Sequence, residues 1–305
     1  MSKTAFIFPG QGAQYVGMGK DFYDTIPACK ETIKLAGEVS GLDMEALLFE
    51  ENENINITEY TQIAMLAAEA AMLKAVEEKG IKPDVTAGLS LGEYGALLAA
   101  GVMDLADVFR LVRKRGIYMQ EEYPQGGAMS AILGLDTDTI EKICEETEGQ
   151  VSVANYNCPG QTVITGEENA VAKAAEKLAE AGAKRCVSLK VSGPFHSPLL
   201  AGAGEKLKAE LENVTVNDIK VPYLANVTAD YVADKSQVKD LLARQVASSV
   251  RWQQSVEKMI ADGVTTFIEI GPGKTLAGFM RKINKDVTVI NIEKVEDLEK
   301  LEALK

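Results

Sequence analysis

Histidine is almost absent from this chain, since His196 is the only one among 305 residues. A nucleophilic serine or cysteine most often relies on a neighbouring histidine to take its proton. If the protein uses such a pair, only His196 can supply the imidazole. A single loop histidine is ordinarily a surface or packing residue, so scarcity alone assigns it no role.

Cysteines are few and scattered. None of the four forms a CxxC pair or has a histidine beside it, so the sequence predicts neither a metal site nor a disulfide framework. This usage fits the reducing cytoplasm. The four are Cys29, Cys144, Cys158 and Cys186.

Long apolar runs and an excess of basic residues are also missing. No run reaches the ~18 apolar residues that a membrane span needs, and the opening MSKTAFIFPG lacks the apolar core and cleavage site of a signal peptide. The formal net charge is -13, whereas phosphate binding favours a basic face. We therefore expect a soluble cytoplasmic protein that binds neither membranes nor nucleic acid.

Short apolar runs alternate with amphipathic stretches over most of the chain. This alternation predicts an α/β fold, with a large domain whose mostly parallel sheet is covered by helices, as in an α/β-hydrolase core. Long helices are expected within residues 57–79, capped by Thr58, and 104–122, capped by Asp104 and ended before Pro124. The expected strands are TAFIFPG, VTAGLS, VPYLANV, TTFIEIG and VTVINI.

The pattern changes between residues 125 and 194, where the units become shorter. Their order is strand, helix, strand, strand, helix, strand, which is typical of a ferredoxin-like α+β unit. We predict a large catalytic domain formed by residues 1–124 and 195–305, with residues 125–194 inserted as a small subdomain. The cleft between the two is the expected site.

A serine stands between glycines in GLSLG, residues 88–92. Small residues at these positions allow a sharp strand-to-helix turn that exposes the Ser90 hydroxyl beside the helix N-terminus, whose free amides can stabilise an oxyanion. The alternative is a chance match, because GxSxG is loosely specified. Glu93 is expected to be a first-turn residue favoured by the helix dipole or a solvated charge.

His196 lies in VSGPFHSPLL, just before a predicted helix start. Ser197 is expected to cap that helix, and Pro198 occupies the first helical position. The histidine is then held in a fixed loop. His196 is far from Ser90 in the sequence, so only the fold can show whether the two side chains are in contact.

Together with these two segments, the opening FPGQGAQ resembles the malonyl-CoA:acyl carrier protein transacylases of bacterial fatty acid synthesis. The resemblance covers nearly the whole chain, and several motifs in the same order make it specific. The further matches are RGIYMQ at 115–120, NYNCPGQ at 155–161, RQVASSVRW at 244–252 and EIGPGKTLAGF at 269–279.

The resemblance implies a reaction and a set of roles. Ser90 attacks malonyl-CoA, His196 takes its proton, and the malonyl-serine ester is then attacked by the phosphopantetheine thiol of acyl carrier protein. Gln11 and Leu91 supply backbone amides to the oxyanion hole, and the Gln245 carbonyl orients the histidine. No cofactor is implied, because the thioesters are substrates, and we expect a monomer.

Leu89 departs from the family pattern. Many members carry histidine immediately before the serine, and this sequence has leucine there. Leucine at this position cannot act as a base. We therefore expect the departure to remove a polar contact at the serine turn more than to change activity.

Selection of a malonyl group calls for a cation that binds its free carboxylate, and arginine does so with two parallel hydrogen bonds. Arg115 follows the helical spacing of Leu105, Val108, Val112 and Met119 and falls toward the apolar face. Helical spacing alone leaves a salt-bridged or snorkelling arginine as an equal alternative, and Arg113 lies near the opposite edge of the face. The RGIYMQ match favours Arg115.

A glycine-rich turn, two asparagines and several basic residues are less specific indicators of function. GPGKT, residues 271–275, lacks a glycine needed for a phosphate loop and is read as a tight turn. Asn155 and Asn157 end a predicted strand and are expected to line the cleft or to form a turn before Pro159. Five basic residues are candidates to attract acidic acyl carrier protein, with solvated surface charge as the alternative: Lys184, Arg185, Lys190, Arg281 and Lys282.

Two other functions are compatible with parts of the sequence. An α/β-hydrolase shares the GxSxG turn, but its histidine usually comes late, whereas about 110 residues follow His196. A docking scaffold without catalysis is the other, and the joint presence of Ser90, His196 and Arg115 argues against it.

Overall fold

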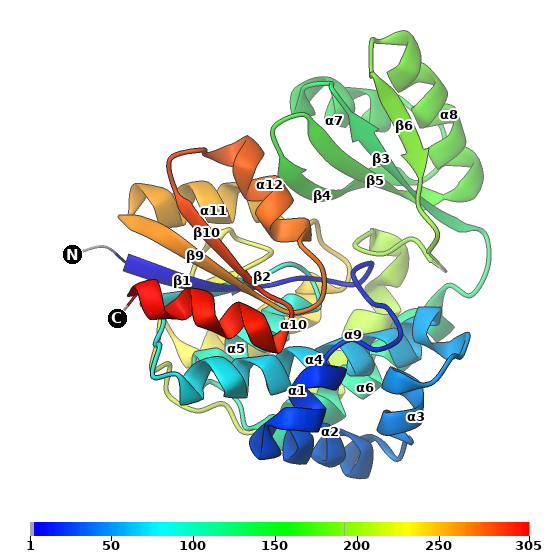
Figure 1. Ribbon diagram of the computed structural model, residues 1–305. Coiled ribbons are helices and arrows are strands. Elements are labelled where there is room, and N and C mark those ends of the chain that lie inside the picture. The colour runs from blue at the N-terminus through cyan, green and yellow to red at the C-terminus, as the bar shows by residue number, and fades with distance from the viewer. Residues whose placement is uncertain (1–2, 192, 305) are drawn as a thin grey trace.

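The computed structural model describes residues 3–191 and 193–304, and within them two separate four-stranded sheets are seen (Figure 1). The larger sheet is parallel, in the order β10-β9-β1-β2. Its two central strands are buried over most of their length, as expected for a sheet covered on both faces. The strands are β1 (Lys3–Phe8), β2 (Val85–Gly88), β9 (Val264–Ile270) and β10 (Thr288–Ile292).

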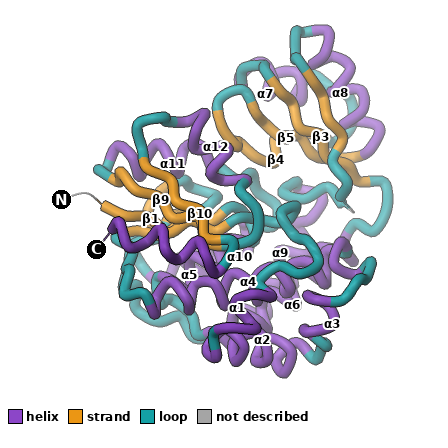
Figure 2. Tube along the Cα trace, in the orientation of Figure 1, coloured by secondary structure: helices purple, strands orange, loops and turns teal. Residues whose placement is uncertain are grey.

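Strand β1 divides its side chains between two cores. Phe6 and Phe8 pack with the helices on one face, among them α4 (Thr58–Glu78) and α6 (Leu105–Glu122), whereas Ala5 and Ile7 pack with α11 (Trp252–Ala261) and α12 (Thr275–Ile283) on the other. Figure 2 shows helices on both sides of the strands. The predicted fold class is therefore confirmed.

The remaining helices of this larger unit are mostly short. The α-helices are α1 (Lys20–Thr25), α2 (Pro27–Ser40), α3 (Met44–Phe49), α5 (Gly92–Ala99), α9 (Ala201–Leu211) and α10 (Val238–Gln245). The 3-10 helices are η1 (Asn54–Asn56), η2 (Pro198–Leu200), η3 (Lys235–Gln237) and η4 (Val295–Leu304). In the part of the chain described here, no helix combines the length and the apolar character needed to cross a membrane.

The second sheet is antiparallel, in the order β4-β5-β3-β6, which is the ferredoxin-like arrangement. Helices α7 (Thr137–Glu145) and α8 (Glu168–Glu180) cover one face, and the other face carries Met129, Ala131 and Val163 toward the larger unit. Its independence as a domain of residues 125–194 stays a prediction. The strands are β3 (Gly127–Leu133), β4 (Val151–Cys158), β5 (Gln161–Glu167) and β6 (Arg185–Ser188).

One expected strand and three expected caps differ from the prediction. The VPYLANV run forms only the short β7 (Leu224–Ala225), paired with β8 (Asp230–Tyr231), and an isolated bridge from Tyr223 to Thr86 joins the run to the large sheet. Thr58 is the first residue of α4, and Ile57 is its N-cap. Asp104 and Ser197 occupy N-cap positions without capping hydrogen bonds.

Candidate active site

The serine turn joins β2 to α5 with almost no free space around it. Ser90 has a φ of 55°, the left-handed conformation that a strand-to-helix turn of this kind stores as strain. A Cβ on Gly88 would lie 1.9 Å from the Gly92 carbonyl oxygen, and one on Gly92 would lie 2.2 Å from the Phe8 carbonyl oxygen. Glycine is therefore required at both positions by close backbone approach.

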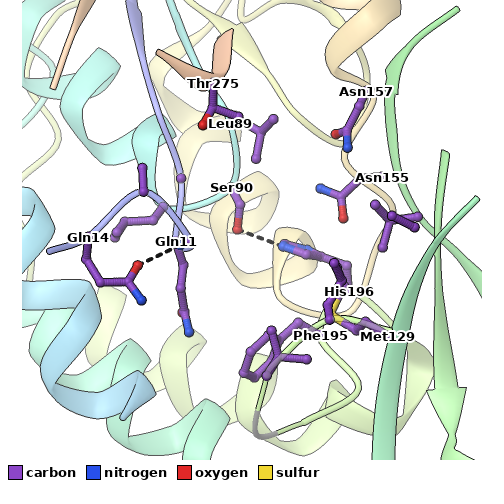
Figure 3. A pocket seen from close by; sticks show the side chains of 18 of the residues that line it. Gln11, Gln14, Leu89, Ser90, Met129, Asn155, Asn157, Phe195, His196 and Thr275 are labelled. Atoms are coloured by element: carbon purple, nitrogen blue, oxygen red, sulfur yellow. Dashed lines mark hydrogen bonds between the residues drawn. The ribbon is translucent and has the colours of Figure 1, made fainter. Parts of the chain in front are cut away.

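The fold brings the lone histidine to this turn. His196 Nε2 lies 2.7 Å from Ser90 Oγ (Figure 3). Its Nδ1 faces two backbone acceptors, Gln245 O at 2.9 Å and Ser248 O at 3.1 Å, so Nδ1 carries the ring proton. Nε2 is then free to accept the proton of the serine hydroxyl, which is the tautomer that a general base needs.

Electrostatics keep this histidine neutral. Burial, and next the positive charge of Arg115, lower the pKa of His196 to about 4, although the carbonyls of Gln245 and Ser248 act in the opposite direction. At neutral pH the imidazole is therefore unprotonated and able to act as a base.

Arg115 lies directly behind the serine. The residue is only 1% exposed, and its Nη2 donates to Ser90 Oγ at 3.3 Å and to Gln245 Oε1 at 3.0 Å. Nη1 donates to Gln62 Oε1 at 2.6 Å, and Nε is buried without a hydrogen-bond partner among the described residues. The guanidinium is thus a buried cation that reaches the nucleophile through Nη2.

Arg113, the competing arginine, is engaged elsewhere. Its Nη1 donates to the Glu59 carbonyl oxygen at 2.7 Å and pairs with the Glu59 carboxylate at 3.1 Å. A partly exposed ion pair of this kind contributes little to the stability of the protein.

The structure also reveals a site residue, Asn226, and side-chain contacts of Gln245 that the sequence did not indicate. Asn226 Oδ1 accepts from the Ser90 N–H at 2.6 Å, and Asn226 N donates to Glu93 Oε2 at 3.0 Å. The Gln245 side chain donates to Ser90 O at 2.9 Å and to Glu93 Oε2 at 2.7 Å. The only local signal was an asparagine inside the apolar run VPYLANV.

Glu93 corrects one expectation. The side chain does lie in the first turn of α5, but it is 1% exposed and is not a solvated charge. Because it receives the N–H groups of Asn226 and Gln245, it belongs to the hydrogen-bond network behind the serine.

A cavity of about 520 Å³ opens above Ser90 and His196, between the large unit and the open face of the second sheet. Figure 3 shows Asn155 and Asn157 projecting from β4 beside the pair. Gln11 and Leu91 line the same cavity, whereas the Ser90 N–H donates to Asn226 Oδ1. The role of the Gln11 and Leu91 backbone amides in an oxyanion hole stays a prediction.

Other segments that the sequence singled out also have defined places in the structure. GPGKT forms the turn between β9 and α12, where the Glu269 carboxylate accepts the first amides of the helix, Leu276 N and Ala277 N, both at 2.9 Å. Of the five basic candidates, Lys190 lines the cavity. In the described ranges, no cluster of three or more His, Cys, Asp or Glu side chains could hold a metal ion.

Comparison with known proteins gives a consistent result. A family model described as an acyl transferase domain matches residues 5–300. The malonyl CoA-acyl carrier protein transacylase of Bacillus subtilis is 46% identical, over 98% of this chain and 96% of the relative. The crystal structure of the Streptococcus pneumoniae MCAT is also 46% identical, with a TM-score of 0.95 over 99% of this chain and all of that one.

A further solved structure contains a partner. It is a malonyl-transacylase in complex with a type II PKS acyl-carrier protein, 38% identical to this chain, with a TM-score of 0.96 and full coverage of both chains.

Proposed function

The chain belongs to the acyl transferase domain family, and from this premise we propose that it transfers the malonyl group from malonyl-CoA to the phosphopantetheine thiol of acyl carrier protein in fatty acid synthesis. The observation that carries the proposal is the 2.7 Å contact between Ser90 Oγ and His196 Nε2 beside the buried Arg115. A nucleophile, a neutral base and a fixed cation are then available to one small acyl group.

In the first half-reaction, Ser90 Oγ attacks the thioester carbonyl and its proton passes to His196 Nε2. The bond from carbonyl carbon to sulfur breaks, His196 returns the proton to the sulfur, and CoA leaves as its thiol. Malonyl-Ser90 remains. In the second half, the carrier's thiol gives its proton to His196 and attacks the ester, and Ser90 recovers its hydroxyl proton.

The tetrahedral intermediate of each half-reaction carries a negative oxygen. The backbone amides of Gln11 and Leu91 are proposed to bind it, and the positive N-terminus of α5 adds to this stabilisation. The Gln245 carbonyl keeps the His196 ring oriented, in the position that an aspartate fills in many triads.

Arg115 is proposed to bind the malonyl carboxylate, and the contact of its Nη2 with Ser90 Oγ supports this role. Asn155 is proposed to contact the substrate from the opposite wall of the cavity. The reaction needs no cofactor, because the thiol carriers are themselves the substrates.

We further propose that the enzyme acts as a cytoplasmic monomer. Among the described residues, only Ile57 and Val187 are large hydrophobic side chains classed as exposed, which gives little apolar surface for self-association. The free thiols of Cys29, Cys144, Cys158 and Cys186 suit a reducing compartment. Light scattering behind size-exclusion chromatography measures the oligomeric state directly.

Labelled malonyl-CoA tests the reaction. The ester on Ser90 is isolated, identified by peptide mass spectrometry, and then offered either acyl carrier protein or water. Transfer to the carrier is expected, with Ser90→Ala as the unlabelled control. Rapid release to water would instead identify a hydrolase, and absence of any ester would identify a scaffold without catalysis.

A further inference from the structure

Arg115 is a buried cation whose immediate partners are neutral. Its two terminal nitrogens donate to the amide oxygens of Gln62 and Gln245 and to the Ser90 hydroxyl, and the guanidinium lies 5.6 Å from the centre of the Tyr94 ring. No ion pair joins it to a carboxylate among the described residues. Buried arginines are normally paired, so the compensating charge must lie farther away or come from the substrate.

A buried carboxylate is found one side chain beyond. Gln245 accepts from Arg115 Nη2 through Oε1 at 3.0 Å and donates through Nε2 to Glu93 Oε2 at 2.7 Å. Glu93 Oε2 also accepts from Asn226 N, whereas Oε1 is buried without a hydrogen-bond partner in the described chain. The Gln245 amide therefore connects the cation to a carboxylate that has one oxygen able to carry a proton.

We propose that Glu93 is a positioning residue that sets specificity: through Gln245, its protonation state controls how strongly Arg115 holds the carboxylate of the acyl group. The inference rests on the proposed function, in which Arg115 binds that carboxylate. Glu93 itself does not touch the substrate.

The sign of the effect follows from charge. With Glu93 neutral, the Arg115 charge is fully available to the malonyl carboxylate, and with Glu93 ionised, part of that charge is offset. Burial raises the pKa of Glu93 to about 7, although Asn226, Gln245 and Arg115 act in the opposite direction. Malonyl binding should therefore weaken as pH rises through 7, by about tenfold for a unit charge in a partly buried site.

Other charged and titratable groups lie around the cluster. Arg115 faces it from α6, Tyr94 lies on α5, and Tyr223 precedes β7; burial raises the pKa of both tyrosines. The pKa of His196 is about 4. Glu69 on α4 is a buried carboxyl next to α5, since a Cβ on Gly95 of α5 would lie 3.2 Å from its Oε2. Burial raises its pKa as well, which makes Glu69 the matched control.

Linkage requires a reciprocal effect on the proton. If ionisation of Glu93 weakens malonyl binding about tenfold, then malonyl binding raises the pKa of Glu93 by about one unit. Binding near pH 7.5 should then take up about half a proton per site.

The first experiment measures KM for malonyl-CoA and kcat of the acylation step between pH 6 and 8.5. The wild-type KM is expected to rise about sevenfold over this range, toward a limit of about tenfold, with kcat changing little. Glu93→Gln keeps the hydrogen bonds of Oε2 and should give a low, pH-independent KM, whereas Glu69→Gln should retain the wild-type rise. The inhibition constant of CoA, which has the same phosphates but no malonyl carboxylate, should stay flat.

A flat wild-type KM, the same rise in Glu93→Gln, or loss of the rise in Glu69→Gln would overturn the proposal. If Glu93→Gln does not fold, Ser90→Ala protein still tests it by calorimetry of malonyl-CoA binding in buffers of different ionisation enthalpy. Uptake of about half a proton supports the proposal, and no uptake beyond that seen with CoA contradicts it. Failure of the proposed function is distinct, because no Ser90 ester would then form at any pH.

Discussion

At the scale of residues, the chemistry depends on a histidine that stays neutral because it is buried. The low pKa of His196 places its protonation well below physiological pH, so a serine hydroxyl always meets an unprotonated Nε2. A buried imidazole is a weaker base than an exposed one. The two carbonyl oxygens that face Nδ1 restore part of this basicity, because they stabilise the imidazolium.

Replacement of the base should be severe. His196→Ala is expected to slow acylation of Ser90 by ~10²–10⁴ at neutral pH, measured as the rate of ester formation.

In the wild type at saturating malonyl-CoA, the acylation rate should be flat from pH 8 down to about 5 and fall as pH approaches the pKa of about 4, where Nε2 becomes protonated. A fall centred near pH 6.5 would contradict this environment.

The arginine should determine which acyl group is accepted. Arg115→Ala is expected to lower malonyl transfer sharply and to relax the preference against neutral acyl-CoAs, because the variant loses the donors that bind the carboxylate. Competition between malonyl-CoA and acetyl-CoA measures the selectivity. Arg113→Ala removes an arginine on the flank of the same helix that is held by Glu59, so it should leave the selectivity unchanged. Unaltered selectivity in Arg115→Ala would exclude the assignment.

At the scale of elements, the turn between β2 and α5 places the nucleophile, and its geometry depends on backbone contact. The amides of Leu89 and Gly92 both bond to backbone carbonyls, Leu89 N to Phe8 O and Gly92 N to Leu89 O, each at 3.0 Å. The turn is therefore fixed against β1, the neighbouring strand of the sheet.

A single methyl group should disrupt this element. Gly88→Ala would place a Cβ 1.9 Å from Gly92 O, so we expect a loss of about 3 kcal/mol or more in the free energy of unfolding, together with loss of acylation. Chemical denaturation measures the first quantity. The control is Gly278→Ala in α12, where the added Cβ meets no atom within 4 Å and should stabilise the helix by up to about 1 kcal/mol.

At the scale of the whole molecule, the core contains carboxyl groups that favour the protonated form. Glu69 is fully buried, neither of its oxygens has a hydrogen-bond partner in the described chain, and burial followed by the nearby Glu269 raises its pKa. The folded state therefore binds a proton that the unfolded state has released above pH 4.5. This stability is lost as pH rises toward the pKa of the folded state.

Glu69→Gln removes that dependence. Between pH 5 and 7 the free energy of unfolding should fall more steeply in the wild type than in the variant, by up to about 1.4 kcal/mol per pH unit. Urea denaturation at each pH measures it, and Glu31→Gln, an exposed substitution on α2, controls for loss of a carboxylate. Parallel curves for wild type and Glu69→Gln would contradict a protonated Glu69.

Much of the architecture was determined by local sequence. Apolar runs specified the strands of the two larger sheets, and periodicity specified α6, because burial of one face requires a regular spacing of apolar residues. Helix α4 is instead buried on nearly all sides. The caps were less predictable. The Thr58 hydroxyl accepts from a tertiary partner, Gln11 Nε2, and the Ser197 hydroxyl donates to the Pro194 carbonyl oxygen three residues earlier, so neither caps its helix.

The sequence by itself singled out Ser90, from its glycines, and His196, from its uniqueness, while resemblance to a family favoured Arg115. Only the tertiary structure decided that Glu93 is buried and that Asn226 and Gln245 hold the serine turn. Ser90 and Asn226 are 136 positions apart, and Gln245 and Glu93 are 152 apart. Hydrogen bonds over such separations leave no period in the sequence, because they depend on how strands and helices pack and not on any one element.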